Sequence, residues 1–212
     1  MVWQPPKDKT VYNLDVAFDI ARENLAKANI KKQCERSGAE LQRDGTVTIR
    51  YLNQTYRLNI TKADISLVGS KKEVPLRDKI LLIHYFVQSK GTLPSKNQIT
   101  YRDLPGGLVY FPTFEKRTVE PLVDCFGSIP SRIIKAGEVL GASSPHMGDA
   151  SLLINAFPHV PIYVLIWASD TELPPGGNIL FDANINDYLD SEDVTIVCET
   201  ITWRLINYAN SL

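Results

Sequence analysis

The sequence contains few cysteines and no cysteine pair. Its 212 residues include three, Cys34, Cys125 and Cys198, which lie far apart and form no C-x-x-C motif. An odd number of widely spaced cysteines argues against a disulfide framework, and against an iron–sulfur or zinc site built from cysteines of this chain. Free thiols are typical of a reducing compartment, so we expect a cytoplasmic protein.

Long apolar segments and an excess of one charge are also lacking. The apolar runs fall well short of the ~20 residues that cross a bilayer, and residues 1–7 contain no apolar signal region. The chain carries 23 Lys and Arg against 24 Asp and Glu, with acids and bases interspersed. We therefore expect neither a membrane span nor nucleic-acid binding.

Motifs that specify a reaction are absent as well. The chain has no G-x-S-x-G elbow, no P-loop, no G-x-G-x-x-G and no H-E-x-x-H. Cys34 lies near Lys31 and Lys32, which could lower the pKa of its thiol. Cys125 and Cys198 lie in apolar stripes that are typical of core residues. The sequence therefore identifies no nucleophile and no reaction.

What the sequence does contain is apolar periodicity. Apolar residues repeat at intervals of three and four, the spacing of one helical face, along five segments. Asn13 and Ser128 precede the first and fourth of these, Ser191 begins the fifth, and each of the three can cap its helix. Pro121 should disturb the middle of the third. The predicted helices cover residues 14–36, 75–89, 113–126, 129–140 and 191–209.

A second period, of two residues, predicts strands. Apolar and polar residues alternate over 39–60, with a tight-turn signal at Asp44-Gly45. This alternation gives one buried and one solvated face, so the segment predicts a β meander. Further strands are expected at 150–156, 160–168 and 178–182, and a short strand or extended segment at 108–111.

The order of these elements indicates the fold class. Helices and strands occur in clusters rather than in strict alternation, which favours an α+β fold. We expect an antiparallel or mixed sheet that includes the N-terminal meander and is covered by about five helices. The length suits a single domain over 1–212, and any division into lobes would separate residues 1–91 from 103–212.

The strongest candidate site lies in residues 161–182. An apolar run ends at Trp167, Asp170 and Glu172 follow, and a second apolar run after Pro174-Pro175 ends at Asp182. If the two runs pair as a hairpin, we expect the three carboxylates near one end of the sheet, where they could hold a hard cation or a ligand, or supply a general acid. The simpler alternative is that acids beside Pro-Pro-Gly-Gly are solvated turn residues.

Aromatic side chains extend this candidate. Trp167 and Tyr110 both occur near the ends of expected elements, and such side chains line ligand pockets as well as ordinary cores. The predicted ligand- or partner-binding residues are Trp167, Asp170, Glu172, Asp182 and Tyr110.

Histidines provide a second candidate. His146, Asp149 and His159 flank one loop and strand and could form a composite metal site, although no two histidines have helical metal-ligand spacing. His84 lies at helical intervals from Ile80 and is expected to be a half-packed residue at the border of the core.

Short motifs spread along the chain carry a further signal. They are Asp103-Leu104-Pro105-Gly106-Gly107, Pro121-Leu122 before Phe126-Gly127, Gly148-Asp149, Phe157-Pro158-His159-Val160-Pro161, Trp167 with Asp170 and Glu172, Ile179-Leu180-Phe181-Asp182, and Tyr188-Leu189-Asp190-Ser191-Glu192-Asp193. In order and spacing they resemble an uncharacterised prokaryotic family, a domain of unknown function, and the resemblance covers most of the chain. It implies relatives mainly in anaerobic bacteria and archaea, some of them joined to a cysteine-rich iron–sulfur module, and no established activity.

The function expected from the sequence is therefore general. We expect a binding or accessory protein of unknown ligand or partner rather than an enzyme. The resemblance suggests a setting in anaerobic redox or corrinoid metabolism, with an iron–sulfur or corrinoid protein as partner and with no cluster of its own, since this chain lacks those cysteines. Two alternatives stay open: a metal-assisted enzyme with a carboxylate and histidine site, and a structural subunit of an oligomer.

Overall fold

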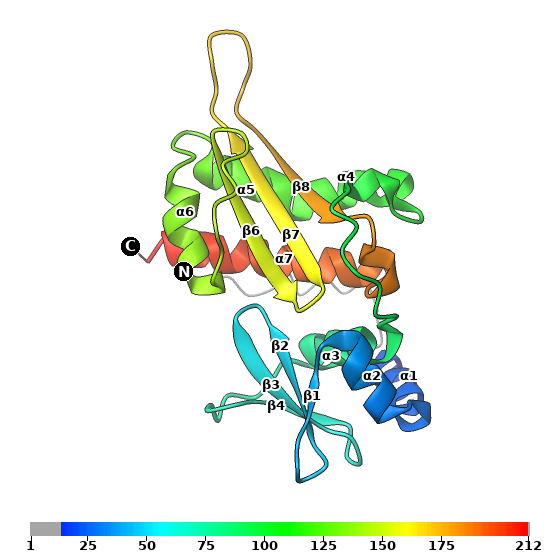
Figure 1. Cartoon of the computed structure of the whole chain (residues 1–212). Coiled ribbons are helices and arrows are strands. Elements are labelled where there is room, and N and C mark those ends of the chain that lie inside the picture. Colours follow the sequence, from blue (N-terminus) through cyan, green and yellow to red (C-terminus); the bar gives the residue numbers. More distant parts are fainter. Residues whose placement is uncertain (1–13, 212) are drawn as a thin grey trace.

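The computed structural model describes residues 14–211 and contains two separate sheets (Figure 1). We call residues 14–91 the N-terminal lobe and residues 92–211 the C-terminal lobe. In the N-terminal lobe a meander follows two helices and precedes a third. Its sheet has the order β1-β2-β3-β4 and is antiparallel throughout. The elements are α1 (Leu14–Lys27), α2 (Ile30–Ser37), β1 (Glu40–Leu41), β2 (Val47–Tyr51), β3 (Gln54–Asn59), β4 (Asp64–Leu67) and α3 (Leu76–Gln88).

The C-terminal lobe holds a second antiparallel sheet, of order β5-β8-β7-β6. Helices α5 and α6 pack on this sheet, and α7 packs on both of them (Figure 1). The elements are β5 (Gln98–Thr100), α4 (Gly107–Arg117), α5 (Val119–Phe126), α6 (Arg132–Gly137), β6 (Ala150–Phe157), β7 (Val160–Trp167), β8 (Gly176–Asp182) and α7 (Ser191–Ala209). Short 3-10 turns cover Tyr101–Asp103, Glu138–Leu140 and Ile185–Asp187.

The predicted α+β class and the meander are confirmed, with two sheets in place of one. The meander has a fourth strand, β4, which the sequence did not predict. The predicted helix 14–36 is two helices, because Asn29 interrupts it and caps the second by accepting a hydrogen bond from the Lys32 amide at 3.1 Å. The predicted cap Asn13 lies outside the described residues.

Residues 107–126 correct the sequence prediction most clearly. The expected extended segment 108–111 is wrong, since it forms the first turn of α4. The expected single helix 113–126 is two helices that separate at Thr118, whose hydroxyl donates to the Phe114 carbonyl at 2.7 Å. Pro121 is the third residue of α5. N–H groups in the first turn of a helix make no hydrogen bond within the helix, so the missing N–H of proline costs nothing there.

Three smaller differences concern helix starts and one strand. The helix predicted from 129 begins at Arg132 rather than after Ser128, and ends in a 3-10 turn. The cap of α7 is Asp190, which accepts from the Asp193 amide, and Ser191 is the first helical residue. Strand β5 was missed because residues 92–102 are mostly polar.

Aromatic side chains join the lobes. The Phe157 ring, at the end of β6, stacks on Tyr85 of α3 at 4.0 Å and on Tyr51 of β2 at 4.7 Å between ring centroids. The Leu52 amide donates to the Ala156 carbonyl at 2.9 Å. One buried apolar cluster therefore contains residues of both lobes, while independent folding as one domain stays a prediction. None of the helices between residues 14 and 211 has the length and apolar character of a membrane span.

Candidate functional site

The register of β7 and β8 decides which predicted site residues meet. Trp167 pairs with Gly176, and Ile162 pairs with Phe181. Asp182 therefore lies at the opposite end of the hairpin from Asp170 and Glu172, because a strand as long as β8 spans about 20 Å. The expectation that all three carboxylates lie near one end of the sheet is wrong.

Asp182 has a structural role at its own end of the strand. Its buried carboxylate accepts hydrogen bonds from the Ser95 amide (3.0 Å) and hydroxyl (2.9 Å), the Lys96 amide (2.7 Å) and the Asn184 amide (3.0 Å). Burial opposes ionisation, but these hydrogen bonds outweigh it and lower the pKa of Asp182. Asp182 thus fixes the segment before β5 against the end of β8.

The other end of the sheet, residues 144–149 and 167–176, is called the loop end. Its central side chain is Trp167, which is 39% exposed. The indole packs so closely on Gly148 that a Cβ there would lie 3.0 Å from the Trp167 Nε1. Asp149 accepts a hydrogen bond from the Ala168 amide at 2.8 Å. The loop end is therefore a continuous surface made by two segments of the lobe.

Residues 168–175 project from the body of the protein (Figure 1). Asp170 shapes this loop, since its carboxylate accepts from the Glu172 amide (2.8 Å) and the Leu173 amide (2.7 Å), and its own amide donates to the Leu173 carbonyl. The same amide hydrogen bonds lower the pKa of Asp170. Glu172 is exposed beside it, and Leu173 is 66% exposed. Asp170 is thus a turn former, and Trp167, Glu172 and Leu173 form the accessible surface.

The three residues of the predicted metal site do not meet. His146 and Asp149 lie at the loop end, whereas His159 lies in the β6–β7 turn, separated from Asp149 by the length of β6. The His159 ring packs on Tyr188 at 5.5 Å between centroids, and burial lowers its pKa. Within residues 14–211, no group of three or more histidine, cysteine or acidic side chains could hold a metal ion.

Tyr110 does not belong to the loop end either. It is 62% exposed on the first turn of α4, next to the exposed Leu108 and Val109. Phe111, on the same turn, is covered by the Arg102 guanidinium 3.9 Å from its ring centroid. The aromatic residues singled out in the sequence therefore lie on separate surfaces.

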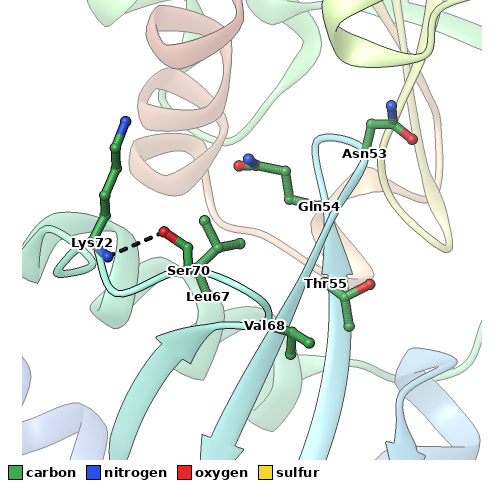
Figure 2. A pocket seen from close by; sticks show the side chains of 7 residues that line it. All are labelled: Asn53, Gln54, Thr55, Leu67, Val68, Ser70 and Lys72. Atoms are coloured by element: carbon green, nitrogen blue, oxygen red, sulfur yellow. Dashed lines mark hydrogen bonds between the residues drawn. The ribbon is translucent and has the colours of Figure 1, made fainter.

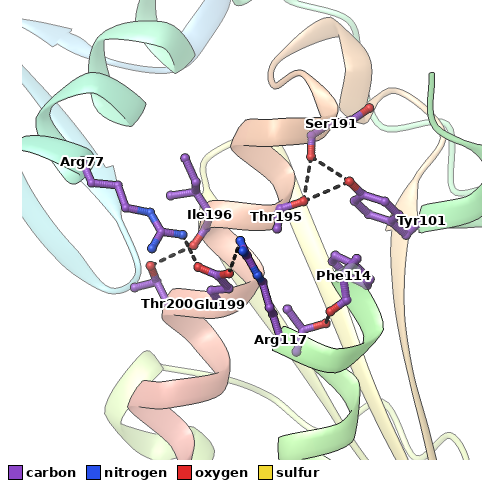
Figure 3. A network of polar contacts seen from close by, with 10 residues as sticks. Arg77, Tyr101, Phe114, Arg117, Ser191, Thr195, Ile196, Glu199 and Thr200 are labelled. Atoms are coloured by element: carbon purple, nitrogen blue, oxygen red, sulfur yellow. Dashed lines mark hydrogen bonds and ion pairs between the residues drawn. The ribbon is translucent and has the colours of Figure 1, made fainter. Parts of the chain in front are cut away.

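Sequence reasoning missed a charged seam between the lobes, formed by Arg77 and His84 of α3, Arg117 of α4, and Asp193 and Glu199 of α7. The Glu199 carboxylate accepts hydrogen bonds from Arg77 and, at 3.4 Å, from Arg117 (Figure 3). Six residues earlier on α7, the Asp193 carboxylate lies 3.0 Å from the His84 Nδ1. The glutamate side chain is 7% exposed and the aspartate 3%. The seam therefore pairs two nearly buried carboxylates with cationic or histidine partners.

Burial governs the titration of the seam. It raises the pKa of Asp193 to about 6, although the hydrogen bond and charge of His84 act in the opposite direction. Burial also opposes the charge of His84, but the hydrogen bond and the charge of Asp193 outweigh it and raise the pKa of His84. The sequence predicted the half-packed state of His84 but held no signal for its partner, which is 109 residues away.

Burial also determines the pKa values of the three cysteine thiols. The pKa of Cys34 is raised by burial and by the charge of Glu35, so the suggested lowering by Lys31 and Lys32 is wrong. Burial also raises the pKa of Cys125 and of Cys198. None of the three thiols is activated as a nucleophile.

Comparison with family models gives one decisive result. Residues 29–204 match the domain of unknown function DUF3786. The chain belongs to this family. The DUF3786 match confirms the predicted resemblance to an uncharacterised family, while the taxonomic range and the iron–sulfur fusions stay predictions. Neither the curated proteins nor the solved structures gave a match.

The matched region relates the DUF3786 family to the sites above. It contains both sheets, the whole loop end and every residue of the charged seam, and it ends at Arg204 inside α7. Helix α1 lies outside it. Both sheets therefore lie within the region that matches the family.

Proposed function

We propose that this DUF3786 protein is a binding or accessory protein that recognises a partner protein through its loop end. The observation that carries the proposal is the projecting loop 168–175 (Figure 1), in which Leu173 is exposed and which directly follows the partly exposed Trp167 at the end of β7. A partly exposed tryptophan fits the hot-spot pattern of interfaces, in which a few large side chains fill pockets of the partner. Leu173 adds exposed apolar area in the loop that follows.

The internal hydrogen bonds of the loop support this role. Asp170 binds two amides of its own loop, and Pro174-Pro175 restricts the backbone before β8. A loop that is ordered before binding loses less conformational entropy in the complex. The proposed task of Asp170 is thus to present Leu173 and Glu172, and that of Trp167 is to contact the partner.

Charge defines the partner more closely. Residues 168–175 contain two acids, Asp170 and Glu172, and no Lys or Arg, and Asp149 lies beside them. The complementary surface is an apolar pocket bordered by basic side chains, since opposite charges steer association and fix register. An iron–sulfur or corrinoid protein of anaerobic metabolism is the partner class that the family resemblance suggests.

Site-specific photo-crosslinking in the native host tests the proposal. A benzophenone side chain placed at position 173 should capture one protein, and the same group at Leu41, an exposed apolar residue of the other lobe, should not. The captured protein is then purified and titrated. We expect Leu173→Ser to weaken binding at least tenfold, about 1.4 kcal/mol, and Leu41→Ser to leave it unchanged. Equal capture at both positions, or full affinity of Leu173→Ser, would exclude the loop as the contact surface.

A role as a subunit of an oligomer has its own supporting observation. Leu108, Val109 and Tyr110 are consecutive and exposed on α4. A contiguous apolar surface of this kind is typical of an interface. Sedimentation velocity tests it: self-association that Val109→Ser abolishes would support this role, and a monomer at high concentration would reject it.

A further inference from the structure

A polar pocket lies in the N-terminal lobe, apart from the loop end (Figure 2). It is open to solvent, has a volume of about 550 Å³, and is formed by the β2–β3 turn together with the end of β4 and the segment that follows. Its lining combines amide and hydroxyl side chains with two apolar residues. The lining residues are Asn53, Gln54, Thr55, Leu67, Val68, Ser70 and Lys72.

Lys72 is the charged residue of this wall. Figure 2 shows its side chain on one side of the pocket and Asn53 on the other. The Lys72 backbone amide donates to the Ser70 hydroxyl at 3.1 Å, which fixes the segment that carries the ammonium group. Within residues 14–211 that ammonium has no carboxylate within ion-pair distance. Its charge is therefore available to a ligand.

A second cation, Arg204, contacts the lining residue Gln54 but does not itself line the pocket. Arg204 of α7 donates to the side-chain oxygen of Gln54 at 3.3 Å and lies 6.0 Å from the Tyr51 ring centroid. In the described part of the chain no carboxylate lies within ion-pair distance of Arg204. Asp78 interacts electrostatically with Arg204: burial raises the pKa of the Asp78 carboxyl group, and the charges of Arg204 and Arg77 lower it. Arg204 therefore adds positive potential to the wall at Gln54.

These groups match one class of ligand. Two cations without ion-pair partners attract an anion, and Lys is a common point-charge ligand of phosphate and carboxylate. Side-chain amides and hydroxyls such as Asn53 and Ser70 donate to and accept from hydroxyl groups. A volume of this size is typical of sites for small molecules rather than for single ions.

We propose that this pocket binds a small hydroxylated anion, a phosphate monoester or a hydroxycarboxylate, through Lys72 and the Gln54–Arg204 pair. The site lies in a different lobe from the loop end and goes beyond the partner binding proposed above. Gln54 of β3 connects this pocket of the N-terminal lobe to Arg204 of α7 in the other lobe.

Ligand titration of the full chain tests the proposal. Glycerol 3-phosphate, citrate, inorganic phosphate and uncharged glycerol are added at low ionic strength, and affinity is measured by calorimetry and by the shift of the melting temperature. A ligand that binds only the native state raises that temperature. We expect either glycerol 3-phosphate or citrate to bind, and glycerol not to bind. Binding of glycerol 3-phosphate would identify a phosphate site, and binding of citrate a carboxylate site. Added NaCl should weaken binding because it screens the charges.

Two matched variants decide the location. Lys72→Gln should lower the affinity at least tenfold, whereas Lys71→Gln removes the same charge from the neighbouring exposed residue, outside the pocket, and should leave it unchanged. Neither side chain is buried, so both variants should fold. Failure of every anion to bind, or equal effects of the two variants, would overturn the proposal. Leu173→Ser should bind the anion normally, so this result is independent of the loop-end proposal.

Discussion

Replacement of Asp193 by asparagine tests the charged seam most directly. The Asp193 carboxyl group is nearly fully buried, and its partner across the lobes is His84. Asparagine keeps the shape of the side chain but resembles the protonated acid, so it removes the titration without opening a cavity. The variant should therefore change the pH dependence of stability rather than the fold.

The magnitude follows from the pKa. Burial raises the pKa of Asp193 from 3.8 to about 6, so the folded protein keeps the proton over a range in which the unfolded chain has lost it. The stabilising contribution is complete below pH 3.8 and is lost as the pH rises to about 6. Two pKa units correspond to about 3 kcal/mol. The raised pKa of His84 acts in the same direction. Its stabilising contribution is complete below the pKa of histidine in the unfolded chain, and it is lost as the pH rises through the pKa of His84 in the folded protein.

Urea unfolding at pH 4 to 8, followed by tryptophan fluorescence, provides the assay. The free energy of unfolding of Asp193→Asn, minus that of the wild type, should increase by about 3 kcal/mol between pH 4 and pH 7. This difference cancels the contributions of all other carboxylates.

Asp187→Asn is the matched control with the opposite sign. Hydrogen bonds from Lys90 and Thr92 lower the pKa of Asp187, so its stabilising contribution is present at neutral pH and is lost as the pH falls. Its variant should be most destabilised at pH 7. A pH-independent difference between Asp193→Asn and the wild type would refute the reasoning, because it would mean that Asp193 is not desolvated in the folded protein.

Three further predictions concern local structure. Asp182→Asn should destabilise the protein by about 2 kcal/mol in urea unfolding, because a buried ionised acceptor of several hydrogen bonds is lost; unchanged stability would contradict its structural role. Gly107→Ala should lower the free energy of unfolding by ~2 kcal/mol or more, since its Cβ would lie 2.0 Å from the Tyr101 carbonyl oxygen; a neutral effect would refute that close packing. Ellman's reagent at pH 7 should label the half-buried Cys125 well before the fully buried Cys198, which should react only after unfolding; rapid labelling of Cys198 would show that the core is open.

Local periodicity accounts for the elements that were predicted correctly. The alternation over 39–60 and the Asp44-Gly45 turn specify the meander, because burial of one face of a strand follows directly from a period of two. Element ends were harder to predict. The separation of α4 from α5 at Thr118 depends on a side-chain hydrogen bond that competes with the helix, and this is not visible in a hydrophobic pattern.

The sequence by itself determined the fold class, most of the helices and strands, and the membership in DUF3786, because these depend on patterns read along the chain. The tertiary structure alone decided which polar groups meet. The strand register places Asp182 far from Asp170, and helix packing brings His84 to Asp193 and Arg204 to Gln54. Such pairings depend on contacts between residues more than a hundred positions apart, for which a single sequence carries no periodic signal. Trp167 and Glu172 of the predicted site lie at the loop end. The pairs that the sequence did not predict, His84 with Asp193 and Gln54 with Arg204, lie between the two lobes.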